Sequence, residues 1–182
     1  MAKIDYVINY ETMLIETADH PEYLTKILDV KKGTIYSKRT PKSLMKEAAF
    51  LNNLSIKGHL DVVNKRFPNM KKIPLMINPN LSVIMIPTTS PSNANCKWIN
   101  YIQIDDYFEH ENKSKIIFRN GEEILLPITY YVLDKQVSKA TKIIGLNTRQ
   151  HVERYMLTQE EKLQRASEFV MEYIQEYLKM KE

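Results

Sequence analysis

The stretch from residue 73 to residue 127 carries five short apolar runs with no helical pattern between them. Parallel strands need a long crossover, usually a helix, so runs separated only by turns predict antiparallel pairing. The turn signals include Asn78-Pro79-Asn80 and Asn120-Gly121, the second of which favours a tight type I′ hairpin. The five runs are residues 75–77, 83–86, 98–104, 115–118 and 122–126. A doubly wound parallel sheet is therefore excluded, and an antiparallel sheet is expected.

Two helix-start signals precede these strands. Thr40 can cap a helix whose first residue is Pro41, and Ser55 can cap a second helix. Apolar residues then recur at helical spacing, which assigns Phe50 and Phe67 to the core. The spaced residues are Leu44, Met45, Ala48, Ala49 and Leu51 in the first helix and Ile56, Leu60, Val63 and Phe67 in the second. We expect a helix pair inserted before the main strands.

After residue 128 the pattern becomes helical again. Thr158 and Glu161 form a capping box, which predicts that a second C-terminal helix begins there. Its apolar stripe includes Leu163, Phe169 and Val170. The predicted fold is therefore α+β: an antiparallel sheet, a basic helix pair inserted before the main strands, and two C-terminal helices.

Positive charge is concentrated in the helix pair. Residues 31–72 hold 11 Lys or Arg and 2 Asp or Glu, a net charge of +9, whereas the whole chain carries +4. Such a block is typical of a polyanion-binding face, although an unevenly charged solvated surface fits the composition equally well. Aromatic residues are few within it, which favours duplex binding over stacking of single strands.

The basic residues that we expect to contact DNA come from this block and from the positively charged stretch after residue 134. They are Lys38, Arg39, Lys42, Lys46, Lys57, Lys65, Arg66, Lys71, Lys72, Lys139 and Lys142.

Residues that would carry catalysis or bind a metal do not converge in the sequence. The four histidines are scattered, one cysteine cannot complete a zinc site, and no glycine-rich phosphate loop is present. Cys96 could act as a nucleophile with a distant histidine, but an inert thiol beside Trp98 is the favoured interpretation. We therefore predict a protein that is not an enzyme, with no catalytic residue, metal or cofactor.

The compartment is also predicted from the sequence. No apolar run approaches the roughly 20 residues of a membrane-spanning helix, and the N-terminus lacks a secretion signal. A single cysteine, which cannot build a disulfide framework, suits a reducing environment. We expect a cytoplasmic protein without a membrane partner.

Five segments in the centre of the chain stand in a distinctive order and spacing. They are KIPLMINP at 72–79, IMIPT at 84–88, NCKWIN at 95–100, FRNG at 118–121 and LPITY at 126–130. Together they resemble the core signature of the competence transcription factor (ComK) family. The helix pair departs from the family pattern at Phe50-Leu51-Asn52 and at Gly58-His59.

The resemblance implies a transcription activator of competence (DNA-uptake) genes. Such proteins bind paired AT-rich boxes in double-stranded DNA from the minor groove, as dimers that associate into tetramers, and act with RNA polymerase at the nucleoid. Residues 1–154 would form the DNA-binding α+β domain. Residues 155–182 would form a C-terminal amphipathic helix, either part of the same compact unit or an oligomerisation element.

One further motif lies at the start of this last helix. Tyr155-Met156-Leu157 resembles the family's binding motif for a degradation adaptor, which delivers the activator to an ATP-dependent protease in regulated proteolysis. The same residues also fit an apolar staple before a capped helix.

Two other functions stay open at this point. The charge by itself would suit a non-specific DNA or RNA binder, and the apolar stripe of the last helix would suit a protein-interaction module.

Overall fold

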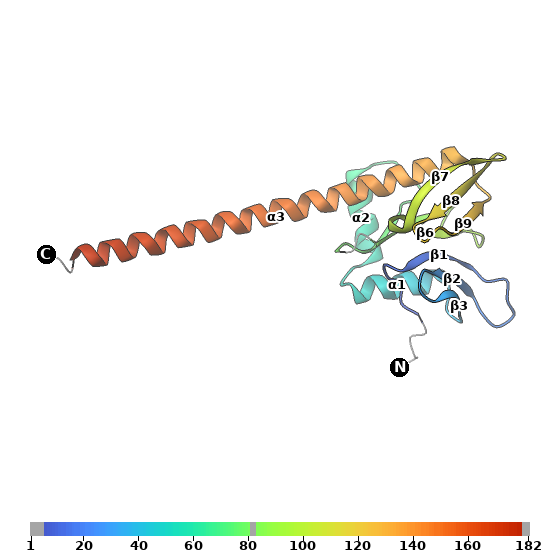
Figure 1. Cartoon of the computed structure of the whole chain (residues 1–182), viewed down its shortest axis with the longest axis horizontal. Coiled ribbons are helices and arrows are strands. Elements are labelled where there is room, and N and C mark those ends of the chain that lie inside the picture. The colour runs from blue at the N-terminus through green and yellow to red at the C-terminus, as the bar shows by residue number, and fades with distance from the viewer. Residues whose placement is uncertain (1–5, 81–82, 180–182) are drawn as a thin grey trace. The chain divides into compact units, whose positions relative to one another are not determined.

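The computed structural model describes residues 6–80 and 83–179, and its elements are drawn in Figure 1. The chain divides into two units, Met1–Ile144 and Gly145–Glu182. The first unit holds the described strands together with the helices α1 (Pro41–Leu51) and α2 (Ile56–Arg66). The helix α3 (Tyr130–Lys179) begins in the first unit and forms the described part of the second.

The larger sheet of the first unit is antiparallel throughout. Its strands lie in the order β3-β2-β1-β6-β5-β4, and every neighbouring pair is antiparallel. The strands are β1 (Thr12–Thr17), β2 (Thr25–Asp29), β3 (Gly33–Ser37), β4 (Leu75–Asn78), β5 (Val83–Pro87) and β6 (Trp98–Asn100). The predicted α+β class with antiparallel pairing is confirmed.

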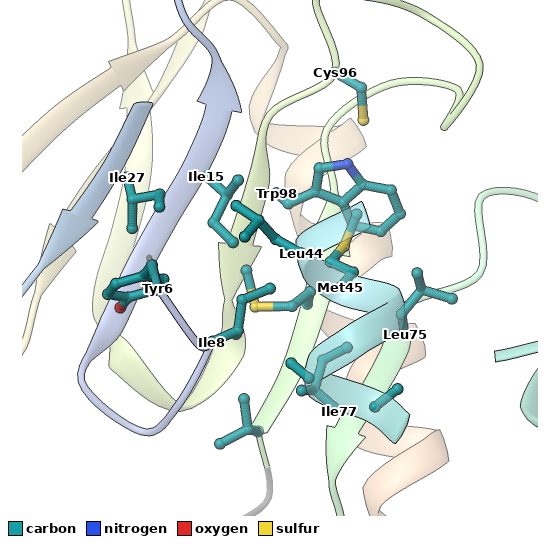
Figure 2. Close-up of a cluster of buried hydrophobic side chains, with 14 residues drawn as sticks. Tyr6, Ile8, Ile15, Ile27, Leu44, Met45, Leu75, Ile77, Cys96 and Trp98 are labelled. Atoms are coloured by element: carbon teal, nitrogen blue, oxygen red, sulfur yellow. The ribbon is translucent and has the colours of Figure 1, made fainter. Parts of the chain in front are cut away.

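Both faces of this sheet are buried, which explains why its strands read as continuous apolar runs. Successive side chains of a strand point to opposite faces, so Leu14 and Ile15 enter two different clusters. On one face Ile15 and Trp98 pack with Leu44 and Met45 of α1, as Figure 2 shows. The other face packs against the first turns of α3 and against the second sheet.

The second sheet has the strand order β7-β8-β9 and is also antiparallel. Its strands are β7 (Ile104–His110), β8 (Lys113–Phe118) and β9 (Glu123–Leu126), and the short helix η1 (Tyr101–Gln103) leads into it. The structure thus has two sheets where one was expected. The hairpin at Asn120-Gly121 exists, but the predicted turn type is wrong, because a type I′ turn needs positive φ at both central residues and only Gly121 has it, at 82°.

The N-terminal caps of the helix pair are confirmed. The Thr40 side chain accepts a hydrogen bond from the backbone N–H of Ser43, and Pro41 is the first residue of α1. The Ser55 side chain accepts from the backbone N–H of Gly58 at the start of α2. Each cap satisfies one backbone donor that has no partner inside its helix.

The C-terminal region contains one helix where two were predicted. Thr158 lies inside α3 and therefore does not begin a helix. Tyr155, Met156 and Leu157 also lie inside α3, so their interpretation as a staple before a helix is wrong. Between Tyr130 and Lys179 there is no proline and a single glycine, Gly145, so no residue in this stretch stops the helix.

Candidate nucleic-acid interface

A groove of about 1010 Å³ lies in the first unit, lined by α1, α2, the loop before β6 and the residues that enter β4. We call it the helix-pair groove. Its interior is apolar and includes Leu60, Leu75 and the buried side chains of Met45 and Trp98. Four of the predicted DNA-binding residues line it: Lys42, Lys46, Lys57 and Lys72. None of the described residues that line this groove is acidic.

Helical spacing explains why these lysines gather. Lys42 and Lys46 are four residues apart and therefore neighbours on the exposed side of α1, while Leu44 and Met45 face the core. Lys57 lies in the first turn of α2, close to the capped helix start. Cations that share one surface without a lining carboxylate produce a positive potential, which attracts a polyanion.

Five other exposed residues of the predicted DNA-binding set lie outside this groove. Lys65 and Arg66 occupy the last turn of α2, where the helix dipole favours positive charge. Lys71 precedes β4, Lys142 is exposed on α3 within the first unit, and Lys38 follows β3 with its ammonium 6.0 Å from the ring centroid of Tyr23. The structure therefore brings four of the eleven predicted residues to the groove and places these five elsewhere on the surface.

Two of the predicted residues hold the fold instead of presenting a free charge. Arg39 forms a salt bridge with Glu47, and its Nη2 donates to the Ser43 hydroxyl at 3.0 Å. Lys139 Nζ donates to the Lys71 carbonyl oxygen and to the Gln136 side-chain oxygen, both at 2.7 Å. Partial burial lowers the pKa of Lys139, and the nearby ammoniums of Lys72 and Lys135 lower it further.

Hydrogen bonds from side chains of α3 hold the segment that carries Lys72. Lys72 has a left-handed φ of 51°, a conformation that costs free energy for a residue with a side chain. The Gln136 side-chain amide donates to the carbonyl oxygens of Lys72, at 3.2 Å, and Pro87, at 2.6 Å. Together with the bond from Lys139 to Lys71, these contacts hold Lys72 at the groove.

The expectation that Phe50 belongs to the core is wrong. Phe50 is 75% exposed and Leu51 is 51% exposed at the end of α1. Phe67, in contrast, is half-buried and packs against a buried cluster, as expected. The sequence does hold a signal for Phe50, because it follows Lys46 by four residues and so lies on the lysine face of α1.

The residues of the adaptor-like motif lie on α3 in the second unit. Tyr155, Met156 and Leu157 are exposed, and so are Leu163 and Phe169 further along the helix. In the chain as described, these apolar side chains are available to a partner.

The described residues offer no group of three His, Cys, Asp or Glu side chains that could hold a metal ion. Cys96 is buried in the cluster that contains Trp98 (Figure 2). None of the helices in the described part of the chain is long and apolar enough to cross a membrane.

The fold and this surface define the class: an α+β protein that presents a basic helix pair beside an antiparallel sheet. The family model of the ComK protein matches residues 3–152, and the chain belongs to the ComK family. It is similar to the competence transcription factor of Bacillus subtilis (strain 168), with 30% identity over 67 residues. That match covers 36% of this chain and 35% of the relative, about a third of its length. No solved structure matches the chain.

Proposed function

We propose that this protein is a DNA-binding transcription activator of competence genes. The observation that carries the proposal is the set of four lysines lining the helix-pair groove, with no acidic residue among the described residues that line it. A duplex carries one negative charge per about 1.7 Å of helix axis, so a compact cluster of ammoniums suits it. Membership in the ComK family, and the name of the relative in Bacillus subtilis, support transcription as the purpose of that binding.

The target that suits such a surface is AT-rich duplex approached from the minor groove, with paired boxes bound by a dimer or tetramer. AT-rich minor grooves are narrow and carry an enhanced negative potential, which attracts Lys and Arg without a code of base-edge hydrogen bonds. The contacts would come from the exposed members of the predicted set, above all Lys42, Lys46, Lys57 and Lys72. Lys38, Lys65, Arg66, Lys71 and Lys142 would add contacts to phosphates beside them.

The second unit serves assembly and turnover in this proposal. Residues 155–182 would mediate self-association through their apolar stripe, while residues 1–154 bind DNA. Exposed Tyr155, Met156 and Leu157 would present the adaptor motif that leads to an ATP-dependent protease. RNA polymerase would be the partner at the promoter, and the protein would act at the nucleoid in the cytoplasm.

Fluorescence anisotropy tests the proposal. The full-length protein is titrated against a duplex with paired AT-rich boxes and against a duplex of scrambled, GC-rich sequence, each at several salt concentrations. We expect tighter binding to the AT-rich duplex and an affinity that falls as salt rises, by about 0.9 log units per log unit of salt for each phosphate neutralised. Equal affinity for the two duplexes would contradict sequence selectivity.

A protein-interaction module is the second candidate, and the exposed stripe with Leu163 and Phe169 favours it. It predicts no salt-dependent binding to either duplex. A non-specific nucleic-acid binder would instead bind both duplexes alike and lose both to competing RNA at physiological salt.

A further inference from the structure

Phe50, on the basic face of α1, and its neighbour Leu51, at the end of the helix, form an exposed apolar pair. Phe50 lies one turn after Lys46 and two turns after Lys42 on the same side of α1, and all three line the helix-pair groove. Leu51 is the last residue of the helix. An aromatic ring left in water forfeits about 1.5–3 kcal/mol of burial energy, which a partner that covers the ring would recover.

The pair is held rigidly, which distinguishes it from a frayed helix end. The backbone N–H of Leu54 donates to the Ala49 carbonyl oxygen and that of Asn53 donates to the Phe50 carbonyl oxygen, both at 2.9 Å. With Asn53 at a left-handed φ of 58°, these two bonds make a Schellman motif at the end of α1.

The helix end is also tied to its surroundings. Leu54 packs against the buried cluster under α1. The Asn52 side chain donates to the Ala48 carbonyl oxygen and accepts from the Asn78 side chain of β4, each at 2.8 Å. Phe50 and Leu51 therefore project from a fixed platform.

The charge around the pair selects the kind of partner. Lys42 and Lys46 precede it on α1, Lys57 follows it in the first turn of α2, and none of the described residues lining the groove is acidic. An apolar partner surface would leave these ammoniums without counter-charges. A DNA duplex presents phosphates to the lysines and, between its stacked base pairs, an apolar space for a flat ring. Duplex DNA therefore complements both features of this surface.

We propose that Phe50 and Leu51 form a wedge that enters between two stacked base pairs and kinks the duplex. The inference rests on the proposed DNA binding and adds the means by which sequence is selected. Wedges that enter from the minor groove bend DNA by roughly 20–90° toward the major groove. Pyrimidine–purine steps such as TA unstack most easily, so a wedge favours AT-rich boxes without a base-edge hydrogen bond.

The test uses the full-length protein and a duplex that contains one AT-rich box with a central TA step and a fluorophore at each end. Energy transfer at saturating protein reports the bend, and anisotropy reports the affinity. We expect the wild-type protein to bend this duplex. The variant with Phe50→Ala and Leu51→Ala should bind about 5- to 100-fold more weakly, the range of one lost base–aromatic contact, and leave the bound duplex straight.

Three control variants separate the wedge from other effects. Leu125→Ala removes another exposed apolar side chain, on β9, and should change neither the bend nor the affinity. Phe50→Leu keeps an apolar wedge and should keep most of the bend. Lys46→Ala should lower the affinity and the salt dependence while leaving the bend of the saturated complex unchanged. Thermal unfolding checks that each variant folds.

The outcomes distinguish the wedge from the function on which it rests. A wild-type bend in the double alanine variant overturns the wedge. So does wild-type protein that binds the AT-rich box selectively without bending it, and in that case the proposed function stands. If the wild-type protein binds neither this AT-rich duplex nor the scrambled, GC-rich duplex, both proposals are overturned.

Discussion

The helix pair and the second unit both expose large apolar side chains beside charged ones, but they differ in how those side chains are supported. In the pair, side-chain caps begin both helices, a Schellman motif ends α1, and Leu44 and Val63 anchor the helices in buried clusters. In the second unit the described side chains from Val152 to Met171 are exposed, except half-buried Gln159. The exposed apolar groups of the helix pair therefore lie on helices that the first unit itself holds in place. The apolar stripe on α3 can be buried only by a partner.

The largest effect that we expect is a loss of affinity for DNA when the charges of the helix pair, and not those of the second unit, are reversed. Reversing Lys42→Glu, Lys46→Glu and Lys57→Glu together should lower affinity for AT-rich duplex at least about 100-fold at fixed salt, because attraction to phosphates becomes repulsion. The slope of log affinity against log salt should fall by about three units, one for each cation that contacted a phosphate. Anisotropy at several salt concentrations measures both quantities.

The matched control lies in the second unit. Lys162→Glu and Arg165→Glu reverse two exposed charges on α3 and should leave the duplex affinity within about threefold of wild type. An equal loss in both sets would mean that net charge, and not the helix-pair platform, determines binding.

The next effect concerns self-association, which we assign to the second unit. Leu163→Asp and Phe169→Asp place carboxylates in the exposed stripe, so the average mass in sedimentation equilibrium should fall toward that of the monomer. Gln164→Asp and Ser167→Asp introduce the same residues at polar, exposed positions of the helix and should leave the mass unchanged. If both pairs sediment like wild type, the stripe does not mediate assembly.

Local signals in the sequence predicted the first unit well. Thr40 and Ser55 cap their helices as expected, because a cap depends on residues within one turn. One turn lacks such a local signal. The positive φ values at Glu111 and Asn112 give the type I′ conformation to the turn between β7 and β8, although this pair lacks the glycine on which such predictions rely.

The lysines of the groove were also predictable, since charge and helical spacing are local properties. The roles of Arg39 and Lys139 were not, because each is set by a contact that the sequence does not display. Lys139 donates to the carbonyl oxygen of Lys71, a residue far away in the chain. The sequence does not distinguish a lysine that bonds to the backbone from one whose charge is free. Phe50 was misassigned because apolar residues at helical spacing are usually buried.

A third, smaller effect tests the rigidity of the platform. Asn53 has a left-handed φ of 58°, which asparagine tolerates and a β-branched residue does not. Asn53→Val should lower the free energy of unfolding by about 1–2 kcal/mol, and Asn53→Gly should keep or slightly raise it. Asn147→Val, inside α3, should cost less than about 0.5 kcal/mol because only helix propensity changes. Urea titrations give these values, and an equal cost at the two positions would contradict a fixed turn.

The smallest effect that we expect is a change in how the free energy of unfolding depends on pH, and it involves His59 of α2. Its Nε2 lies 2.9 Å from the Pro74 carbonyl oxygen and 3.4 Å from the Met76 backbone nitrogen, so the ring of His59 contacts the backbone at the start of β4. Burial lowers the pKa of His59 below its usual range, and the Pro74 carbonyl offsets part of that. The native state therefore keeps the ring neutral in a range where the unfolded chain binds a proton.

The sign of the effect follows from proton linkage. Above the unfolded pKa near 6.5 neither state protonates His59, and its contribution to stability is fully present. As the pH falls below that value the unfolded state takes up the proton first, so the free energy of unfolding drops, by at most about 1.4 kcal/mol per pH unit for one group. His59→Gln keeps a donor for the Pro74 carbonyl and should flatten this part of the curve. Urea titrations between about pH 4.5 and 7.5 compare the two proteins, and parallel curves would show that His59 does not link pH to the stability of the helix pair.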